Sequence, residues 1–486
     1  MTATLKQKTV SGLIWSFTEN IANHGVTFIV GIILARLLSP QEFGLIGMIT
    51  IFIAISTSVI NSGFSQALIR KNNCTQTDFS TVFYFNLLVG AAMFALLAIS
   101  APLISRFFEE PQLIPLIRVL SVVLIIDSVT IIQRTILTKN INFKLQTKIS
   151  AISSILSGII GIVMAYNGFG VWSLVARQIA GRFFNSLLLW FWNKWKPLWI
   201  FSKDSFHELF NFGYKLLIAG LIQTLYRNIY YAIIGKFFSA AELGYYTRAE
   251  GFNQLPSQNI TSVVQRVTFP VLASIQDDLP RLKIAYKKLI RSTVLITFTL
   301  MLGMAAVAEP LILTLVGEKW RTSILYLQML SFVGMMYPLQ ALNLNMLNVQ
   351  GRSDLVLKLQ VIKRILAIPT IVAGVIWGME VLIAGLIVNT LIAYYLNSYW
   401  SGKFLNYPAK EQIYDIFPFF SIALINAFLV YIIGQLLPYN HLMNLIIQIL
   451  AGGILAVGMF ELFKFESYIE LKRNILLQIS RIIKIK

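Results

Sequence analysis

The sequence is poor in the residues from which most soluble and secreted proteins build their sites. Charged residues make up 13% of the 486 residues, about half the share found in a soluble domain. The single cysteine, Cys74, excludes an internal disulfide and a cysteine metal cluster. Three histidines, His24, His207 and His441, lie far apart and lack the spacing of metal ligands. We therefore expect neither a disulfide-stabilised secreted domain nor a bound metal or cofactor.

Apolar residues are abundant and account for 57% of the chain. A helix that crosses a bilayer needs about 20 mostly apolar residues in succession. Hydropathy, with glycine, proline and charged clusters as boundaries, predicts an all-α polytopic membrane protein with about 14 transmembrane helices. These helices are expected near residues 9–35, 43–68, 79–105, 112–137, 146–166, 169–192, 210–236, 246–271, 292–316, 322–349, 356–377, 380–401, 413–437 and 441–463.

Lysine and arginine are distributed unevenly between the two sides of the predicted membrane protein. If Met1 is cytoplasmic, the cytoplasmic segments hold 29 of the 40 basic residues, the opposite loops hold five, and six lie inside helices. Cytoplasmic loops of membrane proteins carry an excess of Lys and Arg, so both termini are expected in the cytoplasm. The same bias accounts for most of the net charge of +19. Nucleic acid is therefore not an expected partner.

A short motif occurs twice, 200 residues apart. Residues 33–44 read ILARLLSPQEFG, and residues 233–244 read IIGKFFSAAELG. Six predicted helices separate the copies, which indicates a parallel repeat about a pseudo-two-fold axis along the membrane normal. We expect six-helix lobes at 1–200 and 201–405, two additional transmembrane helices at 406–464, and a basic amphipathic cytoplasmic tail at 465–486.

The motif also has the pattern of a helix start. Ser39 and Ser239 are predicted to cap the next helix, and Glu42 and Glu242 follow three residues later, in the capping-box position. Another helix start is predicted at Asp278, with proline in the first turn. The residues after it alternate between an apolar and a basic face, which predicts a helix lying on an anionic lipid surface.

Four further segments carry a family resemblance. Residues 11–16 read SGLIWS, 34–44 LARLLSPQEFG, 63–69 GFSQALI and 264–270 VQRVTFP. Together they resemble the polysaccharide-transport (Wzx-like) flippases for O-antigen and exopolysaccharide, which belong to the multidrug/oligosaccharidyl-lipid/polysaccharide superfamily. The resemblance extends over essentially the whole chain, but it does not identify the sugar that is carried.

The resemblance implies a transporter of the bacterial inner membrane and not an enzyme. Such a flippase moves an undecaprenyl-diphosphate-linked oligosaccharide repeat unit from the cytoplasmic to the periplasmic leaflet by alternating access. The implied process is surface polysaccharide biosynthesis, namely of O-antigen (lipopolysaccharide), capsule or exopolysaccharide. The implied partners are the lipid-linked oligosaccharide, the lipid bilayer and the polysaccharide polymerase machinery.

Several charged residues fall inside predicted membrane helices, where an uncompensated charge is expensive. Basic residues outnumber acidic ones there, and a guanidinium group binds phosphate in a bidentate manner. We therefore predict a water-filled cationic cavity that suits a diphosphate headgroup and acidic sugars. Its predicted lining is Arg118, Arg177, Arg182, Arg227, Arg248 and Arg266. The alternative is that some of these arginines pair with carboxylates and only hold helices together.

The first predicted helix carries a stripe of polar residues on one face. Asn20 and Asn23 belong to this stripe and are predicted to line the same cavity. Glu19, Asp127 and Glu250 are candidates for coupling transport to H⁺ or Na⁺. A structural pairing of these acids with arginines is the alternative.

Two other functions are weighed against the flippase. A cation-coupled multidrug antiporter on the same scaffold favours acidic residues in an apolar pocket, whereas this interior is rich in arginine. A membrane glycan polymerase needs a large periplasmic loop and a glycosyltransferase needs a loop with paired acids, yet no predicted loop is long enough. A phosphate-cradling glycine loop is also missing from the sequence, so ATP-driven transport by this chain alone is not expected.

Overall fold

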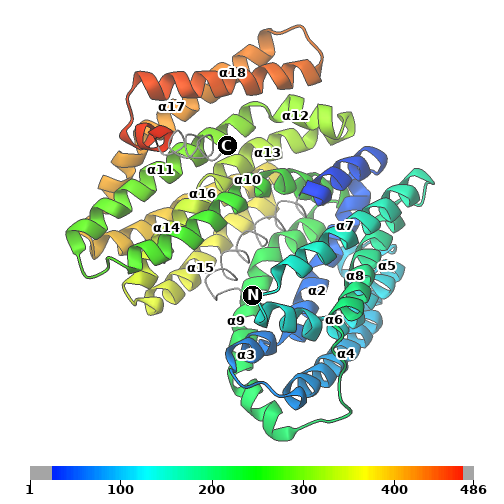
Figure 1. Cartoon of the computed structure of the whole chain (residues 1–486). Helices are drawn as coiled ribbons and strands as arrows, with labels where there is room; N and C mark the ends of the chain where they lie inside the picture. Colours follow the sequence, from blue (N-terminus) through cyan, green and yellow to red (C-terminus); the bar gives the residue numbers. More distant parts are fainter. Residues whose placement is uncertain (1–24, 474–486) are drawn as a thin grey trace, which may run out of the picture. The chain divides into compact units, whose positions relative to one another are not determined.

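The computed structural model describes residues 25–473, and all regular secondary structure in this range is helical. The chain divides after Gly244 into two compact units, 1–244 and 245–486. In the first unit, a helix at Gly25–Leu37 precedes the helices labelled in Figure 1. These are α2 (Pro40–Asn61), α3 (Phe64–Arg70), α4 (Gln76–Phe108), α5 (Leu113–Leu120), α6 (Val122–Lys139), α7 (Phe143–Tyr166), α8 (Val171–Asn193) and α9 (Lys203–Phe237).

The second unit contains most of α10 (Ala240–Ala273), whose first turn belongs to the first unit. It continues with α11 (Leu279–Ala306), α12 (Ala308–Leu315), the short η1 (Glu318–Trp320), α13 (Thr322–Gly334), α14 (Tyr337–Val349), α15 (Ser353–Trp377), α16 (Met379–Lys403), α17 (Ala409–Leu436) and α18 (His441–Leu462). The chain is helical again from 466 to 473, and the remainder of the predicted tail lies outside the described residues.

Ten helical segments within residues 25–473 are long and apolar enough to cross a membrane. Every predicted span from the second to the fourteenth coincides with one helix or a consecutive pair, and the first lies largely outside the described residues. The predicted spans on α8, α9 and α10 are helical but are not among the ten, because polar residues interrupt them. The total of fourteen spans therefore stays a prediction.

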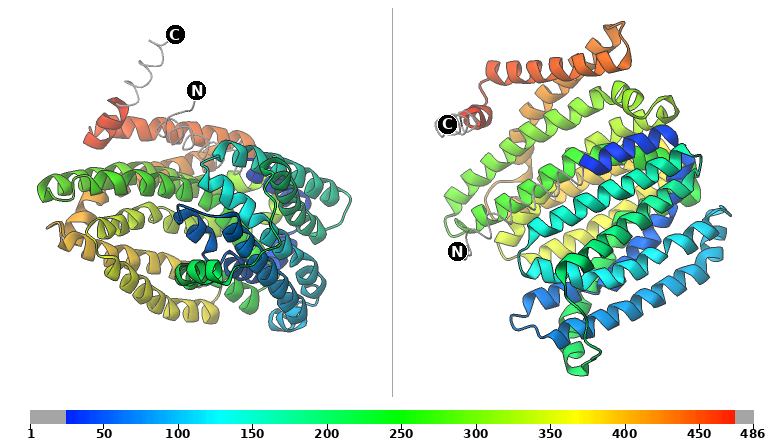
Figure 2. Two further views of the ribbon diagram at one scale, coloured as in Figure 1. Left: turned by 60° about the horizontal axis from the view of Figure 1, so that its bottom comes forward. Right: turned by 45° about the vertical axis from the view of Figure 1, so that its right-hand side comes forward.

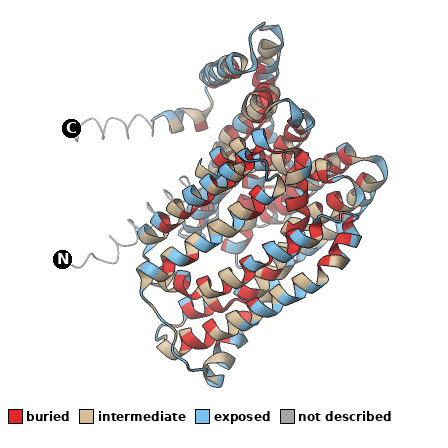
Figure 3. Ribbon diagram, turned by 90° about the vertical axis from the view of Figure 1, so that its right-hand side faces the viewer, coloured by how far each residue is buried: buried red, intermediate tan, exposed pale blue. Residues whose placement is uncertain are grey.

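The distribution of burial is that of a protein dissolved in lipid. Large apolar side chains face outward along the helices, as at Leu88, Ile99 and Leu103 of α4, which are 66–77% exposed. Polar side chains such as Asn86 of the same helix are fully buried. Figure 3 shows buried residues concentrated where helices face one another. A bilayer is the solvent in which these exposed apolar faces are stable, so the chain is a polytopic membrane protein.

Local capping explains where α2 and α11 begin. The Ser39 backbone N–H donates to Glu42 Oε2 over 2.6 Å, and the Glu42 N–H donates back to Ser39 Oγ. This reciprocal pair is the predicted capping box. In the second copy of the motif the Glu242 N–H donates to Ser239 Oγ over 3.1 Å. Asp278 caps α11 as predicted, by accepting from the backbone N–H three residues later.

The two copies of the repeat motif meet in a reciprocal crossing within the first unit. A Cβ added to Gly44 would lie 1.6 Å from the carbonyl oxygen of Ala240, and one added to Gly244 would lie 1.9 Å from that of Pro40. Residue 44 thus contacts residue 240, while residue 244 contacts residue 40. Such an exchange of partners is what a local two-fold axis produces, and glycine is required at both positions for the backbones to approach this closely.

Helices of the first unit pack on neighbours in sequence and on more distant helices. Figures 1 and 2 show α7 beside α8, and α4 and α8 both pack against α6. The helix α9 lies farthest along the chain from its partners, since it packs on α2, α3 and α4. The predicted division into lobes at residue 200 stays a prediction, since the compact units of the structure separate after Gly244.

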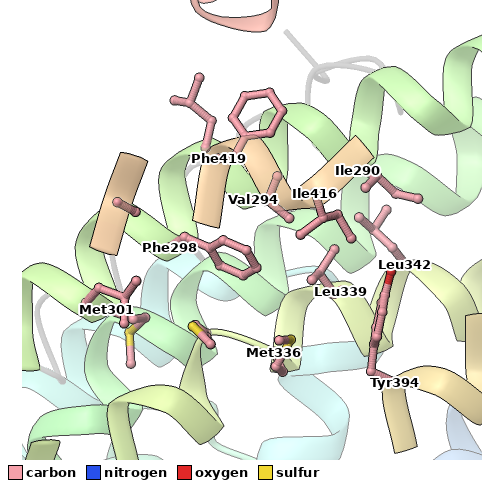
Figure 4. Packing of buried hydrophobic residues seen from close by; sticks show 14 of the residues in the cluster. Ile290, Val294, Phe298, Met301, Met336, Leu339, Leu342, Tyr394, Ile416 and Phe419 are labelled. Atoms are coloured by element: carbon pink, nitrogen blue, oxygen red, sulfur yellow. The ribbon is translucent and has the colours of Figure 1, made fainter. Parts of the chain in front are cut away.

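The second unit has a continuous apolar core between α11, α14, α16 and α17. Figure 4 shows Phe298 of α11, Leu339 of α14 and Ile416 of α17 converging in this core. Figure 1 shows α17 and α18 side by side in the same unit, and these two helices pack together. The core fixes the positions of α11, α14, α16 and α17 relative to one another.

The basic segment after Asp278 is the first half of α11, which continues without a break to Ala306. The basic face was predicted to contact an anionic lipid surface, but three of its cations contact acids of α17. Lys283 and Lys287 pair with Glu411, and Arg291 Nη2 lies 2.7 Å from Asp415 Oδ1. These ion pairs link α11 to α17, while Lys288 pairs with Glu470.

Candidate binding site

The first unit contains a polar cavity of about 240 Å³ between α2, α3, α6 and α8. Each of these helices lies at least partly in a predicted span: α2 and α3 in 43–68, α6 in 112–137 and α8 in 169–192. The cavity therefore lies within the predicted membrane region. Its charged lining residues are Asp127 and Arg134 of α6 and Arg182 of α8. The rest of the lining consists largely of hydroxyl and amide side chains, which suit an anionic and hydroxylated ligand better than an apolar one.

Two predicted residues, Arg182 and Asp127, form an ion pair at this cavity. The Arg182 Nη1 atom lies 3.5 Å from Asp127 Oδ1, with 48% of the arginine side chain and 11% of the aspartate side chain exposed. The second oxygen of Asp127, Oδ2, is buried and has no hydrogen-bond partner among the described residues. The guanidinium group therefore reaches open space while its counter-ion lies beneath it.

Arg134 is a second guanidinium group of the cavity, and the sequence analysis missed it. Its Nη2 atom donates to Asn185 Oδ1 over 2.9 Å. The charge count grouped Arg134 with the cytoplasmic basic residues, although the fourth predicted span, 112–137, and α6 of the structure both contain it. Its spacing from Asp127 was the available signal, since seven residues are two helical turns and bring both side chains to one face.

Helix packing holds these side chains in register. A Cβ at Gly90 of α4 would lie 2.6 Å from the Ser128 side chain, so only glycine allows α4 to approach α6 this closely. On the other side, Trp190 Nε1 of α8 donates to the Val129 carbonyl of α6 over 3.1 Å. Asn193 of α8 also donates to α6. Because α6 is fixed on both sides, its charged face is held toward α2 and α3.

Neutral polar groups complete the wall of the cavity. Thr57 and Asn61 lie four residues apart on α2 and therefore on one face. Opposite them, the Thr135 hydroxyl of α6 donates to Ser65 Oγ of α3 over 3.1 Å. Hydroxyl and amide groups both donate and accept hydrogen bonds. The cavity thus offers two cationic groups, one buried carboxylate and a set of groups that match sugar hydroxyls or phosphate oxygens.

The remaining arginines predicted for the first lobe and its junction lie elsewhere. The stem of Arg177, on another face of α8, packs against Gly161 of α7. Arg118 is exposed, and its Nε donates to the Ala98 carbonyl over 3.4 Å. Arg227 is exposed on α9. None of these three lines the polar cavity.

The predicted residues of α10 belong to the second unit and are not among the residues that line this cavity. The Arg248 guanidinium carbon stands 5.2 Å from the centre of the Trp320 ring, a cation–π contact. Glu250 is partly buried, and Arg266 is exposed. The predictions for Glu19, Asn20 and Asn23 fall outside the described residues.

The second unit has a cavity of different character, with a volume of about 360 Å³. It lies against the core of Figure 4 and is lined by aromatic and aliphatic side chains such as Phe298, Met336 and Tyr394. No carboxylate is among its lining residues in the described part of the chain. The acid in an apolar pocket that a multidrug antiporter favours is therefore not found at this cavity.

The chain is similar in sequence to known proteins of polysaccharide biosynthesis. The family model described as "Polysaccharide biosynthesis protein" matches residues 33–325. The lipopolysaccharide biosynthesis protein WzxC of Escherichia coli is 27% identical over 405 residues, which are 81% of each chain. The succinoglycan biosynthesis transport protein ExoT of Rhizobium meliloti is 26% identical over 321 residues, covering 66% of this chain and 65% of that one.

Another relative is the teichuronic acid biosynthesis protein TuaB of Bacillus subtilis, which is 28% identical over 299 residues. The match spans 61% of this chain and 62% of TuaB, so it covers about three fifths of that protein.

Two solved structures show the same fold. The lipid II flippase MurJ, in an inward closed conformation, superposes with a TM-score of 0.74 at 16% identity, covering 93% of this chain and 98% of that one. An inward-facing multidrug resistance transporter of the MATE family has a TM-score of 0.62 at 14% identity, covering 82% of this chain and 99% of that one. These likenesses establish the architecture alone.

The family model covers well over half of the chain, and its relatives act in surface polysaccharide synthesis. This excludes the glycan polymerase alternative, since the family consists of transporters and not enzymes. The chain belongs to the polysaccharide biosynthesis protein family, the Wzx-like group of bacterial multi-pass membrane transporters for surface polysaccharides.

Proposed function

We propose that the protein is a flippase for an undecaprenyl-diphosphate-linked oligosaccharide repeat unit. It moves this lipid from the cytoplasmic to the periplasmic leaflet by alternating access, with two six-helix lobes around the path and two additional helices beside them. The excess of basic residues in the predicted cytoplasmic segments supports an orientation with both termini in the cytoplasm. The polymerase machinery that extends the repeat unit is the proposed partner on the periplasmic side.

The observation that carries the proposal is the pair of guanidinium groups, Arg134 and Arg182, over a polar cavity in membrane-spanning helices. A diphosphate has several oxygens in a compact group, and guanidinium groups bind such oxygens through paired, charge-assisted hydrogen bonds. Asn61 and the hydroxyl groups of the wall suit the first sugar. A single carboxylate, Asp127, leaves the set with a net positive charge, which favours an anion over a drug cation.

We also propose that Asp127 couples transport to an ion. A bound phosphate competes with Asp127 for Arg182. The Asp127 carboxylate that is released is buried, so binding of H⁺ or Na⁺ stabilises it by compensating its charge. The other charged group at this cavity, Arg134, keeps its charge at all accessible pH values. Asp127→Asn is expected to retain binding and to abolish the response of transport to a pH or sodium gradient. A gradient response equal to that of the native protein would reject this role.

The binding role is tested by export in a strain that lacks the native gene and carries each variant at matched abundance. Arg134→Ala and Arg182→Ala are expected to accumulate lipid-linked repeat units, quantified by mass spectrometry, because the headgroup loses a guanidinium contact. Arg118→Ala is the matched control, since this arginine of the same unit is exposed and lies outside the cavity. Export by Arg134→Ala and Arg182→Ala equal to that of the control would refute the assignment.

A further inference from the structure

We propose that Lys363 of α15 and Asn397 of α16 form a second anion site, which binds an acidic sugar of the transported repeat unit. This inference rests on the proposed flippase function and lies wholly within the second unit. The charge count groups Lys363 with the cytoplasmic basic residues, although the predicted span 356–377 contains it. The structure places it inside α15, a helix long and apolar enough to span the membrane.

Lys363 lies near the middle of its helix. It is the eleventh of the 25 residues of α15, so it stands about 15 Å from the helix start at 1.5 Å per residue. The exposed apolar face of α15 carries Leu357, Val361 and Ile365. At about 100° per residue, Lys363 points to the opposite side, together with the buried Leu359. Its ammonium group is therefore directed into protein and not toward lipid.

Within residues 25–473, Lys363 forms no ion pair with a carboxylate. Its Nζ atom donates to Asn397 Oδ1 over 3.4 Å, a long hydrogen bond. The next residue along α15 is a second cation, Arg364. A charge at this depth is normally compensated by protein or water. In the first unit Arg182 has Asp127 for this purpose, whereas for Lys363 we assign this role to an anionic group of the ligand.

Asn397 adds an unused donor at the same place. Its side chain is fully buried, and its Nδ2 atom has no hydrogen-bond partner among residues 25–473. A buried donor without an acceptor costs free energy, which an acceptor from the ligand recovers. One carboxylate oxygen accepting from Asn397 Nδ2 and another pairing with Lys363 Nζ would satisfy both groups.

The chemistry of the two sites favours different anions. The cavity of the first unit offers two guanidinium groups, which match the geometry of phosphate. Lys363 offers a compact ammonium group next to an amide donor, which suits a single carboxylate. With the diphosphate held in the first unit, the anion left for the second unit is an acidic group on the glycan. A uronic acid or a carboxyalkyl substituent has this chemistry.

The test measures binding of two ligands to the purified full chain in nanodiscs of phosphatidylethanolamine. The ligands are undecaprenyl-diphosphate trisaccharides that differ only in the terminal sugar, glucuronic acid or glucose. The native protein is expected to bind the acidic ligand about tenfold more tightly, because one charge-assisted hydrogen bond is worth that much. Lys363→Gln should remove this preference and leave binding of the neutral ligand unchanged. Lys363→Arg should keep most of it.

Lys358→Gln is the matched control, because Lys358 is exposed on the same helix, and it should retain the full preference. Equal affinity of the native protein for both ligands would overturn the acidic-sugar site while leaving the flippase function intact. A Lys363→Gln variant that loses affinity for both ligands equally would overturn it too, and would assign Lys363 to the diphosphate. Failure of the native protein to bind either ligand would overturn the proposed function together with this inference. Thermal unfolding of each variant shows that the comparison is made on folded protein.

Discussion

The crossing of the two repeat motifs at Gly44 and Gly244 yields a prediction whose size follows from the structure. Replacing Gly44 with alanine places a Cβ 1.6 Å from the carbonyl oxygen of Ala240, while real Cβ atoms essentially never come closer than 3.0 Å to such an atom. The obstacle is backbone, which cannot rotate away as a side chain does. The two backbones must therefore separate by more than an ångström, and the contacts around the crossing are lost with them.

Two opposing effects set the expected loss of stability. Overpacking a tight contact costs about 1–3 kcal/mol, and a backbone obstacle places this substitution at the upper end. Alanine in place of glycine in a helix interior stabilises the helix by up to about 1 kcal/mol. The net expectation is a loss of about 2 kcal/mol for Gly44→Ala, and a similar loss for Gly244→Ala at the reciprocal contact. In a unit of 244 residues this lowers the melting temperature by about 4–8 °C.

The assay is thermal unfolding of the purified variants in one detergent, followed by intrinsic tryptophan fluorescence. Gly251→Ala is the matched control, since Gly251 lies in the same helix as Gly244 and a Cβ there meets nothing within 4 Å. This control should unfold at the native temperature or slightly above it. The double variant of Gly44 and Gly244 should lose less than the sum of the single losses, because the first substitution already widens the crossing. A Gly44→Ala protein as stable as the Gly251→Ala protein would refute the contact.

Two further predictions concern orientation and packing. In a Cys74→Ser background, cysteines introduced at Asn167 and Asn440 should react with a membrane-impermeant maleimide added to intact cells. In the native protein, Cys74 should react with the same reagent only after the cells are permeabilised. The reverse pattern would contradict the proposed topology. Asp415→Ala should destabilise the second unit by about 1–3 kcal/mol, because it removes the 2.7 Å partner of Arg291 and leaves a partly buried guanidinium group without its acceptor. A double-mutant cycle with Arg291→Ala measures the coupling energy of the pair. A coupling energy of zero would show that the pair does not hold α11 to α17.

Much of the fold could be predicted from the sequence because the bilayer imposes a simple rule. A membrane span must be helical and apolar over a fixed length, so the predicted spans from 43 onward coincide with helices of the structure. The capping boxes were predictable for a similar reason, since Ser39 and Glu42 act on backbone groups three residues away. Both rules depend on local sequence, and neither requires knowledge of which helices are neighbours.

The reciprocal contact of Gly44 and Gly244 shows what local rules leave out. The repeat was visible in the sequence and indicated a pseudo-two-fold relation, but its spacing does not reveal that the two copies touch each other. The same holds for α9, which packs on α2 although some 140 residues separate the two helices. Pairing of distant helices depends on the shapes of their faces, and hydropathy does not record those shapes.

Sequence reasoning named two of the charged residues that meet at the candidate cavity, and the two candidate site residues that it missed share one cause. Arg182 was predicted to line a cavity and Asp127 to couple transport to an ion, because each is a charged residue inside a predicted span. Arg134 and Lys363 lie close to clusters of basic residues at helix ends, so a rule that assigns basic residues to cytoplasmic loops assigns them there as well. Both residues nevertheless lie inside predicted spans, 112–137 and 356–377, and within α6 and α15 of the structure. The rule counts charges along the chain, whereas a binding site depends on which face of a helix a charge occupies. Helical spacing corrects it: Arg134 shares a face with Asp127, and Lys363 shares one with the buried Leu359. A cation inside a helix whose face is otherwise buried is therefore a candidate for ligand binding, even where a cluster of basic residues lies close by in the sequence.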